Sequence, residues 1–270
     1  MTRRGRRAES VTLRTEEEIA LLREANQVVA DVLATLSEMV APGVCVRDLD
    51  RQAEAMIRGA GGTPSFLGYM GYPASTCISV DEVIVHGIPN GRVLQEGEIV
   101  SMDVGVYLNG YHGDAAVTVA CGEVSEEKRA LMRVTDLALA RAITAAAAGN
   151  HLCDIGRAVQ QTCEAAGFSV VRSFVGHGIG KEMHEPPQVP NFDFGRRGME
   201  LRAGMVIAIE PMVNAGVHEA VVLEDGWTAV TKDGRPSAHF EHSIVVREHG
   251  GEILSKTPRK TWGVDLTVMR

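Results

Sequence analysis

The sequence predicts an α/β protein made of two related halves. One observation is the order of its elements, because two helical segments followed by short β-rich runs occur twice along the 270 residues. Another is the likeness of segments 97–103 and 204–210, which lie 107 positions apart. Each begins with glycine, continues as an apolar strand and ends in a carboxylate, as in an internal duplication of roughly 110 residues.

The composition excludes several classes of protein. A hydrophobic fraction of 45% and a charged fraction of 23% are those of a globular chain. No apolar run approaches the roughly 20 residues of a membrane helix, and a net charge of −8 disfavours broad nucleic-acid binding. The five cysteines are scattered and odd in number, which suits neither a disulfide framework nor a zinc cluster. We therefore expect a cytoplasmic protein with no membrane and no specific nucleic acid as a partner.

In the first half, Thr15 and Glu18 form a capping-box signal, and apolar residues then recur at helical spacing until Pro42. A second helix fits 46–59, where glycines end it. The expected strands that follow are 77–80, 83–88, 98–108 and 111–120.

The second half is expected to repeat this order. Ser125 opens a long helix that ends near Gly149, and a shorter helix covers about 155–166. The expected strands of this half are 168–174, 204–213, 221–230 and 238–246.

We expect one domain at 13–254, with halves at 13–123 and 124–254, between a basic segment at 1–12 and a tail at 255–270. The first 14 residues carry five arginines, the last of which is Arg14. We interpret this N-terminus as a solvated tail, with weak electrostatic binding to ribosomal RNA as the alternative.

An Asn-Gly pair at 109–110 predicts a two-residue hairpin turn between alternating strands. Such a turn places Asp114 opposite Gly105, with Asp103 two residues away on the same face. Two buried carboxylates this close repel each other unless they are protonated or bridged by a metal.

A second group of polar residues stands in the other half. His177 lies in a glycine-rich turn, Glu210 ends an apolar strand, and Glu241 stands inside another. A carboxylate in such a place needs a compensating charge. With Asp103 and Asp114, the four acids balance two divalent cations, and one histidine among carboxylates favours Mn, Fe, Co or Zn. Two ions about 3.5–4 Å apart activate water, so hydrolysis is the natural reaction class.

At this point the chain resembles the type I methionine aminopeptidases, of the duplicated pita-bread metallopeptidase fold. The matching residues span about 13–254 in family order and spacing, and these are their motifs: Gly68-Tyr69, Gly71-Tyr72-Pro73, Val85-His86-Gly87-Ile88-Pro89, Ser101-Met102-Asp103, His112-Gly113-Asp114, Gly176-His177-Gly178-Ile179-Gly180, His184-Glu185, Ile209-Glu210-Pro211-Met212 and Phe240-Glu241-His242. The resemblance implies a curved antiparallel sheet inside, helices outside and metal ions at the centre.

The same resemblance implies roles for single residues. The metal ligands would be Asp103, Asp114, His177, Glu210 and Glu241, with Asp114 and Glu241 shared by both ions. His86 would donate toward the departing amide nitrogen, His184 would stabilise the oxyanion, and Glu241 would act as the base. The methionine pocket would be lined by Phe66, Tyr69, Tyr72, Cys77, Met183 and Trp227, together with His86 and His184. Phe66 and Met183 differ from the cysteine and phenylalanine that are frequent there in bacterial relatives.

The resemblance implies an enzyme that removes the initiator methionine from nascent chains when the next residue is small and uncharged. The implied cofactors are two divalent ions, and the implied partners are nascent N-termini and, transiently, the ribosome; we expect a monomer. One alternative is a Xaa-Pro aminopeptidase-like hydrolase, although such relatives usually carry a further N-terminal domain. The other is a metal-free binding protein of the same fold, which would be expected to have lost ligands.

Overall fold

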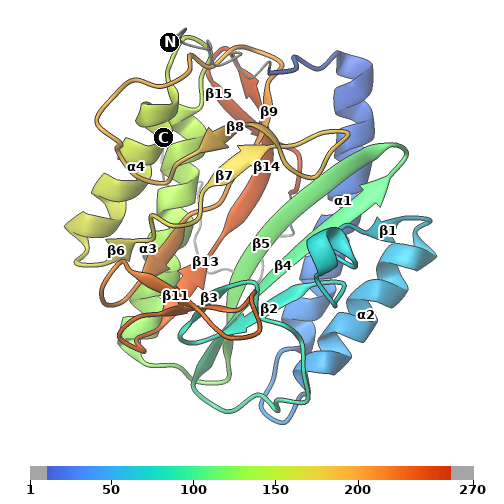
Figure 1. Ribbon diagram of the computed structural model, residues 1–270, viewed down its shortest axis with the longest axis vertical. Coiled ribbons are helices and arrows are strands. Elements are labelled where there is room, and N and C mark those ends of the chain that lie inside the picture. The colour runs from blue at the N-terminus through green and yellow to red at the C-terminus, as the bar shows by residue number, and fades with distance from the viewer. Residues whose placement is uncertain (1–10, 257–270) are drawn as a thin grey trace, which may run out of the picture.

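A nine-stranded antiparallel sheet lies at the centre of the computed structural model, which describes residues 11–256 (Figure 1). In Figure 1, the helices of the first half lie at the right of this sheet and those of the second half at the left. The helices are α1 (Glu16–Met39), α2 (Val46–Gly59), α3 (Glu126–Ala145) and α4 (Leu152–Ala165), with a short 3₁₀ turn, η1 (Tyr69–Gly71).

The strands form one large and two small sheets. The large sheet has the order β1 (Thr63–Pro64), β4 (Glu98–Leu108), β5 (Tyr111–Cys121), β14 (Glu241–Arg247), β9 (Val206–Ile209), β7 (Gly176–Gly178) and β8 (Glu185–Val189), with β2 (Cys77–Val80) on β4 and β15 (Gly250–Ile253) on β14. One small sheet contains β13 (Ser237–His239), β10 (Met212–Asn214) and β6 (Ser169–Val170), and the other β11 (Ala220–Val222), β12 (Ala229–Thr231) and β3 (Val83–Val85).

The order of the large sheet confirms the predicted pair of related halves. Strands β5 and β14 lie side by side at its middle, and they are flanked by β4 and β9. These outer two carry the similar segments 97–103 and 204–210. The carboxylates at the ends of both segments therefore approach one centre from opposite sides.

The helix signals are confirmed in detail at the start of α1. Thr15 Oγ1 accepts a hydrogen bond from Glu18 N at 3.3 Å, and Glu18 Oε2 accepts one from Thr15 N at 3.0 Å. The predicted range 46–59 of α2 is also correct. In contrast, α3 ends at Ala145, before the expected glycine, and α4 begins at Leu152, earlier than expected.

Several strands are shorter than predicted because the chain changes sheet. Segment 204–213 is divided between β9 and β10 around Pro211, which has no N–H to donate to a ladder. Segment 83–88 leaves its sheet after Val85, and His86 has a φ of 60°. Segment 221–230 is a hairpin of β11 and β12, and only Ser169–Val170 of segment 168–174 is a strand.

The expectation of a solvated N-terminus is wrong at Arg14, which is only 8% exposed. Its backbone N–H donates to Gly204 O at 2.8 Å, so the chain is already attached to the second half before α1 begins. Residues 1–10 of the basic segment and 257–270 of the C-terminal tail lie outside the described residues. Within 11–256, no helix combines the length and the hydropathy that a membrane span requires.

Helix α1 packs directly on the β4–β5 hairpin. The closest approach is at Gly113, where an added Cβ would lie 2.6 Å from Asn26 N. Asn26 is fully buried, and its Oδ1 accepts a hydrogen bond from the backbone N–H of Asp114 at 3.2 Å. The packing of α1 thus fixes the strand position that carries a predicted site residue.

We expect Gly113→Ala to lower the free energy of unfolding by about 1–3 kcal/mol, because the methyl group would displace backbone rather than a flexible side chain. Urea denaturation monitored by circular dichroism measures this change. Gly59→Ala is the matched control: it lies at the exposed end of α2 with no atom within 4 Å. It should leave stability unchanged or raise it by about 0.5–1 kcal/mol. Equal effects of the two substitutions would contradict the close packing at Gly113.

Candidate metal centre and substrate pocket

Three adjacent strands place their carboxylates on one face of the large sheet. Asp103 of β4 pairs with Ala116 of β5, which pairs in turn with Glu241 of β14. Asp114 lies two residues from Ala116, on the same face, and opposite Gly105 as the hairpin turn predicts. The predicted register is therefore correct, and it brings three acids from both halves together.

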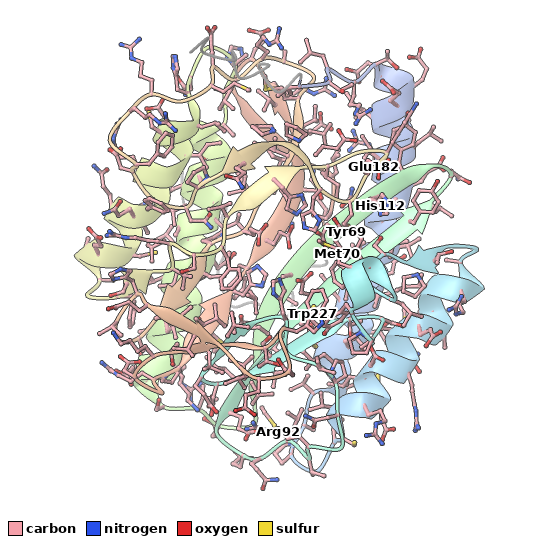
Figure 2. The ribbon with its side chains drawn as sticks, in the orientation of Figure 1. Tyr69, Met70, Arg92, His112, Glu182 and Trp227 are labelled. Atoms are coloured by element: carbon pink, nitrogen blue, oxygen red, sulfur yellow. The ribbon has the colours of Figure 1, made fainter. Side chains whose placement is uncertain are left out.

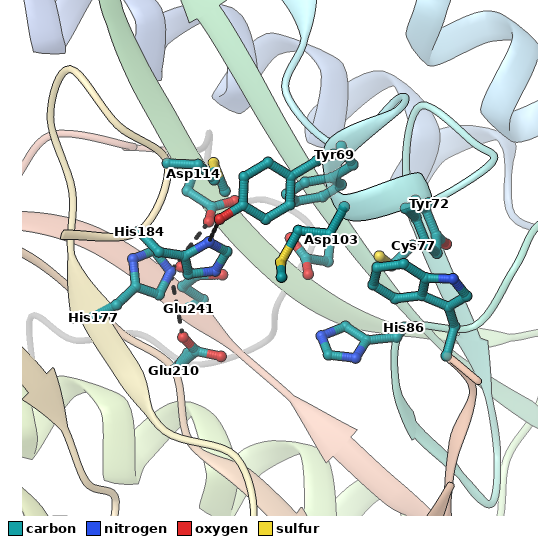
Figure 3. A pocket seen from close by; sticks show the side chains of 14 residues that line it. Tyr69, Tyr72, Cys77, His86, Asp103, Asp114, His177, His184, Glu210 and Glu241 are labelled. Carbon is teal, nitrogen blue, oxygen red and sulfur yellow. Dashed lines mark hydrogen bonds and ion pairs between the residues drawn. The ribbon is translucent and has the colours of Figure 1, made fainter. Parts of the chain in front are cut away.

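The histidine of the second half reaches these acids from β7. His177 Nε2 lies 3.7 Å from Asp114 Oδ2 and 3.6 Å from Glu210 Oε1, as the dashed lines of Figure 3 show. Its Nδ1 donates to Gly178 O at 2.9 Å, since a carbonyl oxygen can only accept. The lone pair of Nε2 is therefore directed at the carboxylates.

The glycines around His177 are required by close backbone contacts. A Cβ on Gly176 would lie 2.3 Å from Ala208 O, and one on Gly178 would lie 2.3 Å from Pro186 O. The neighbouring strands β9 and β8 thus clamp this short strand on both sides. The close packing of the strands requires glycine at these positions, and it also fixes the position of the His177 imidazole.

Removal from water shifts the titration of the whole group. Burial raises the pKa of Asp103 to about 7 and raises the pKa values of Asp114, Glu210 and Glu241 well above the usual range; neighbouring acids raise the pKa values of these last three further. Burial also lowers the pKa of His177 to about 3. Buried carboxylates need compensating positive charge, and a neutral imidazole beside them offers a lone pair but no charge, so a cation is the group that suits this site.

Unsatisfied oxygen atoms show where such a cation fits. Asp103 Oδ1, Asp114 Oδ1 and Glu241 Oε1 are buried and have no hydrogen-bond partner. Donor atoms of Asp114, His177 and Glu241 all lie within 4.8 Å of one another. Orphaned carboxylate oxygens beside a neutral imidazole are the donor set of a divalent metal, so the residues fit the predicted cofactor.

A cavity of about 410 Å³ opens from this cluster, and every predicted site residue lines it. Figure 2 shows Tyr69, Met70 and Trp227 near the centre of the molecule. Figure 3 shows Asp114, His177, His184, Glu210 and Glu241 grouped on one side of the cavity, and His86 and Cys77 on the other. The lining consists of Phe66, Tyr69, Met70, Tyr72, Cys77, His86, Asp103, Asp114, His177, Met183, His184, Glu210, Trp227 and Glu241.

The two further histidines lie on different walls of the cavity. His184 Nδ1 is 2.8 Å from the Tyr69 hydroxyl, and the rings of His184 and His177 are 4.2 Å apart. The rings of Phe174 and Trp227 are nearly perpendicular to the ring of His86, with ring centroids 5.4 and 6.3 Å from it. Burial lowers the pKa of both His86 and His184, so both are neutral at pH 7 and can donate one N–H each.

The remaining wall is apolar and contains sulfur. Phe66, Tyr72, Cys77 and Met183 form one buried cluster, with Trp227 packed against it. The Tyr72 hydroxyl has two backbone carbonyl oxygens as acceptors, Gly87 O at 3.0 Å and Thr76 O at 3.1 Å. Burial raises the pKa of the Cys77 thiol, which keeps this wall uncharged.

Two residues at this site were not predicted. Met70, on η1 between two predicted tyrosines, lines the mouth of the cavity and is 81% exposed. His239 is 1% exposed, and its Nε2 lies 3.8 Å from Glu210 Oε2 without a hydrogen-bond partner. The glycine-flanked setting of Met70 could have revealed it, whereas nothing in the sequence separates His239 from an ordinary core histidine.

Similarity to known proteins covers most of the chain. Residues 20–248 match metallopeptidase family M24. The chain is 49% identical over 245 residues to a methionine aminopeptidase of Clostridium perfringens, covering 91% of this chain and 98% of the relative. The crystal structure of methionine aminopeptidase from Thermotoga maritima has a TM-score of 0.90 at 44% identity, covering 92% of this chain and 100% of that one.

A more distant neighbour shows how far the fold extends. Prolidase from Pyrococcus furiosus has a TM-score of 0.74 at 23% identity, covering 92% of this chain and 66% of that one, and so shares the fold. The high identity and nearly complete coverage are instead with the aminopeptidases. The chain thus belongs to metallopeptidase family M24 and, within it, to the methionine aminopeptidases.

Proposed function

We propose that this metal-dependent aminopeptidase removes the initiator methionine from nascent chains whose second residue is small and uncharged. The observation that supports this most directly is one cavity that joins a carboxylate–histidine cluster to an apolar wall of sulfur and aromatic groups. A thioether is apolar and makes favourable contacts with aromatic rings. The preference for a small second residue is carried over from the family.

Two divalent cations would be held by Asp103, Asp114, His177, Glu210 and Glu241, with Asp114 and Glu241 shared. Their four carboxylates match the charge of two such ions, and three of the four carry an orphaned oxygen. Cobalt, manganese, iron and zinc all suit this donor set. When bound, the ions supply positive charge that polarises the scissile carbonyl and lowers the pKa of the attacking water.

The side chains around the cluster would carry out the proton transfers and stabilise the oxyanion. Glu241 would also accept the proton of the attacking water, since its carboxylate belongs to the same buried cluster. Tyr69 holds His184 by Nδ1, which leaves Nε2 to donate to the carbonyl oxygen as it becomes an oxyanion. His86, which contacts the rings of Phe174 and Trp227, would donate to the departing amide nitrogen.

The substrate partners would be the N-termini of nascent polypeptides, met by a monomer with transient ribosome contact. A cytoplasmic location is in keeping with the five cysteines, all of which are free thiols. Of the two alternatives, a metal-free binding protein is disfavoured because all five proposed ligands are present and line one cavity. A Xaa-Pro aminopeptidase shares the fold, and a substrate comparison separates it.

We expect the protein loaded with Mn²⁺ or Co²⁺ to hydrolyse Met-Ala-Ser and to leave an Ala-Pro peptide intact, because alanine cannot fill the sulfur-lined wall. Methionine release measured by chromatography, with metal analysis of the same sample, tests this expectation. Efficient cleavage of Ala-Pro, or hydrolysis that is unaffected by chelation, would contradict the proposed function.

Asp114→Asn should abolish measurable hydrolysis and weaken metal binding by at least about 100-fold. Loss of a residue that only hydrogen-bonds to a metal ligand already lowers metal affinity by about 10–100-fold, and Asp114 is proposed as a ligand itself. Without metal, the variant should be at least as stable as wild type, because one of four mutually repelling acids is gone. Titration calorimetry and thermal melts with and without Mn²⁺ measure both effects. The matched control is Asp193→Asn, whose carboxylate pairs with Arg157 outside the cavity lining and should change neither. Full activity of Asp114→Asn with two bound ions would contradict the ligand assignment.

His184→Ala should lower kcat by about 10²–10³-fold with little change in KM, because its hydrogen bond strengthens only toward the oxyanion. His177→Ala should instead lose metal, and its activity should partly recover as the metal concentration rises. The measurement is kcat against added Mn²⁺ for both variants. Rescue of His184→Ala but not of His177→Ala would show that the two roles are reversed.

A further inference from the structure

A buried ion pair joins the two halves next to the cavity. Arg14 Nη2 lies 2.6 and 2.5 Å from the two carboxylate oxygens of Glu185, 171 positions further along the chain. The side chains are only 4% and 16% exposed. Desolvating two charges costs free energy that their attraction often does not recover, so a buried pair is weak evidence for stability alone.

Glu185 also organises the turn that carries His184. Its Oε1 accepts backbone hydrogen bonds from Lys181 N at 2.8 Å and Glu182 N at 3.2 Å. The turn so closed contains Met183 and His184, which both line the cavity. The Glu185 carboxylate therefore fixes the position of this turn, and the Arg14 guanidinium fixes the position of the carboxylate.

The guanidinium reaches Glu185 across Gly180. A Cβ on Gly180 would lie 1.9 Å from Arg14 Nη2, so the absence of a side chain here opens the path. Gly180 in turn donates to Glu182 O at 3.1 Å and accepts from the backbone N–H of His112 at 2.8 Å. Glu182 and His112 are neighbours in Figure 2, beside the cavity.

The position of Arg14 is itself fixed by neighbouring residues. It immediately precedes the capping box of α1, and its Nη1 lies 3.6 Å from Glu18 Oε1. The same Glu18 oxygen accepts a hydrogen bond from the Tyr111 hydroxyl at 2.8 Å. The start of α1 and the β4–β5 hairpin thus hold the arginine in place.

We propose that the Arg14–Glu185 pair is a positioning device for catalysis, which holds the turn 181–185 so that His184 meets the reacting carbonyl. The inference rests on the proposed function, because it acts through the role given there to His184. Neither Arg14 nor Glu185 lines the cavity, so their effect is on geometry and not on substrate contact. A displacement of about 1 Å at a reacting group can cost about 10²-fold in rate.

The test compares Arg14→Gln and Glu185→Gln with wild type on Met-Ala-Ser. We expect kcat to fall about 10- to 100-fold in both, with KM and metal content unchanged. Arg14→Lys should recover part of the loss, since it restores the charge but not the planar guanidinium, which contacts Glu185 and Glu18 at once. The control is Arg23→Gln, which breaks another ion pair between α1 and the second half, to Glu252 at 2.6 Å, and should keep wild-type kcat.

A double-mutant comparison isolates the route through His184. In a His184→Ala background, Arg14→Gln should lower kcat no further, because the group that it positions is absent. A methionine phosphonate, whose tetrahedral oxygens resemble the oxyanion, should bind Arg14→Gln more weakly, whereas methionine itself should bind equally well. Should Arg14→Gln fail to fold, Glu185→Gln keeps the side-chain shape and supports the same comparisons.

Three results would overturn the inference. They are an unchanged kcat in both glutamine variants, an equal loss of kcat in the His184→Ala background, and a loss explained wholly by lower metal content. Absence of Met-Ala-Ser hydrolysis by metal-loaded wild type would overturn the proposed function and this inference with it. Wild-type hydrolysis with unaffected variants would overturn only the positioning role.

Discussion

Electrostatic repulsion among four carboxylates withdrawn from bulk water is the constraint on which the rest of the structure depends. Asp103, Asp114, Glu210 and Glu241 share one small region, and neighbouring acids raise the pKa values of the last three. Among residues 11–256, no lysine or arginine forms an ion pair with them. His177 stays neutral, so it offers a lone pair and no charge. The arrangement therefore suits a divalent metal cofactor, whose binding would offset the repulsion and so add to the stability of the folded protein.

The symmetry of the sheet explains how acids from distant parts of the chain reach that region. Strands β5 and β14 pair at the middle, so Asp114 and Glu241 come from the central strands of the two halves. Asp103 and Glu210 come from the flanking strand on each side, and Glu210 directly follows β9. Helix α1 supports the centre from behind through Asn26, which holds the backbone of Asp114. Neither half could build the cluster alone.

Much of this arrangement could be predicted because the deciding signals are local. The turn at 109–110 sets the register of the β4–β5 hairpin, and the capping box at Thr15 sets the start of α1. The strand breaks could not be predicted so well, since the chain changes sheet in response to tertiary pairing. The burial of Arg14 could not be predicted for the same reason. An arginine in a basic segment is normally solvated, and only its partner, 171 positions away, makes it a buried residue.

The sulfur atoms of the pocket differ in their exposure to oxidants. The Cys77 thiol is buried and its pKa is raised, so little thiolate is available, and thiolate is the form that peroxides attack. Met70, by contrast, stands at the mouth of the same cavity with its thioether in solvent. Oxidation would therefore begin at the rim, where a sulfoxide is polar but reducible, and would spare the buried wall that is proposed to hold the substrate side chain.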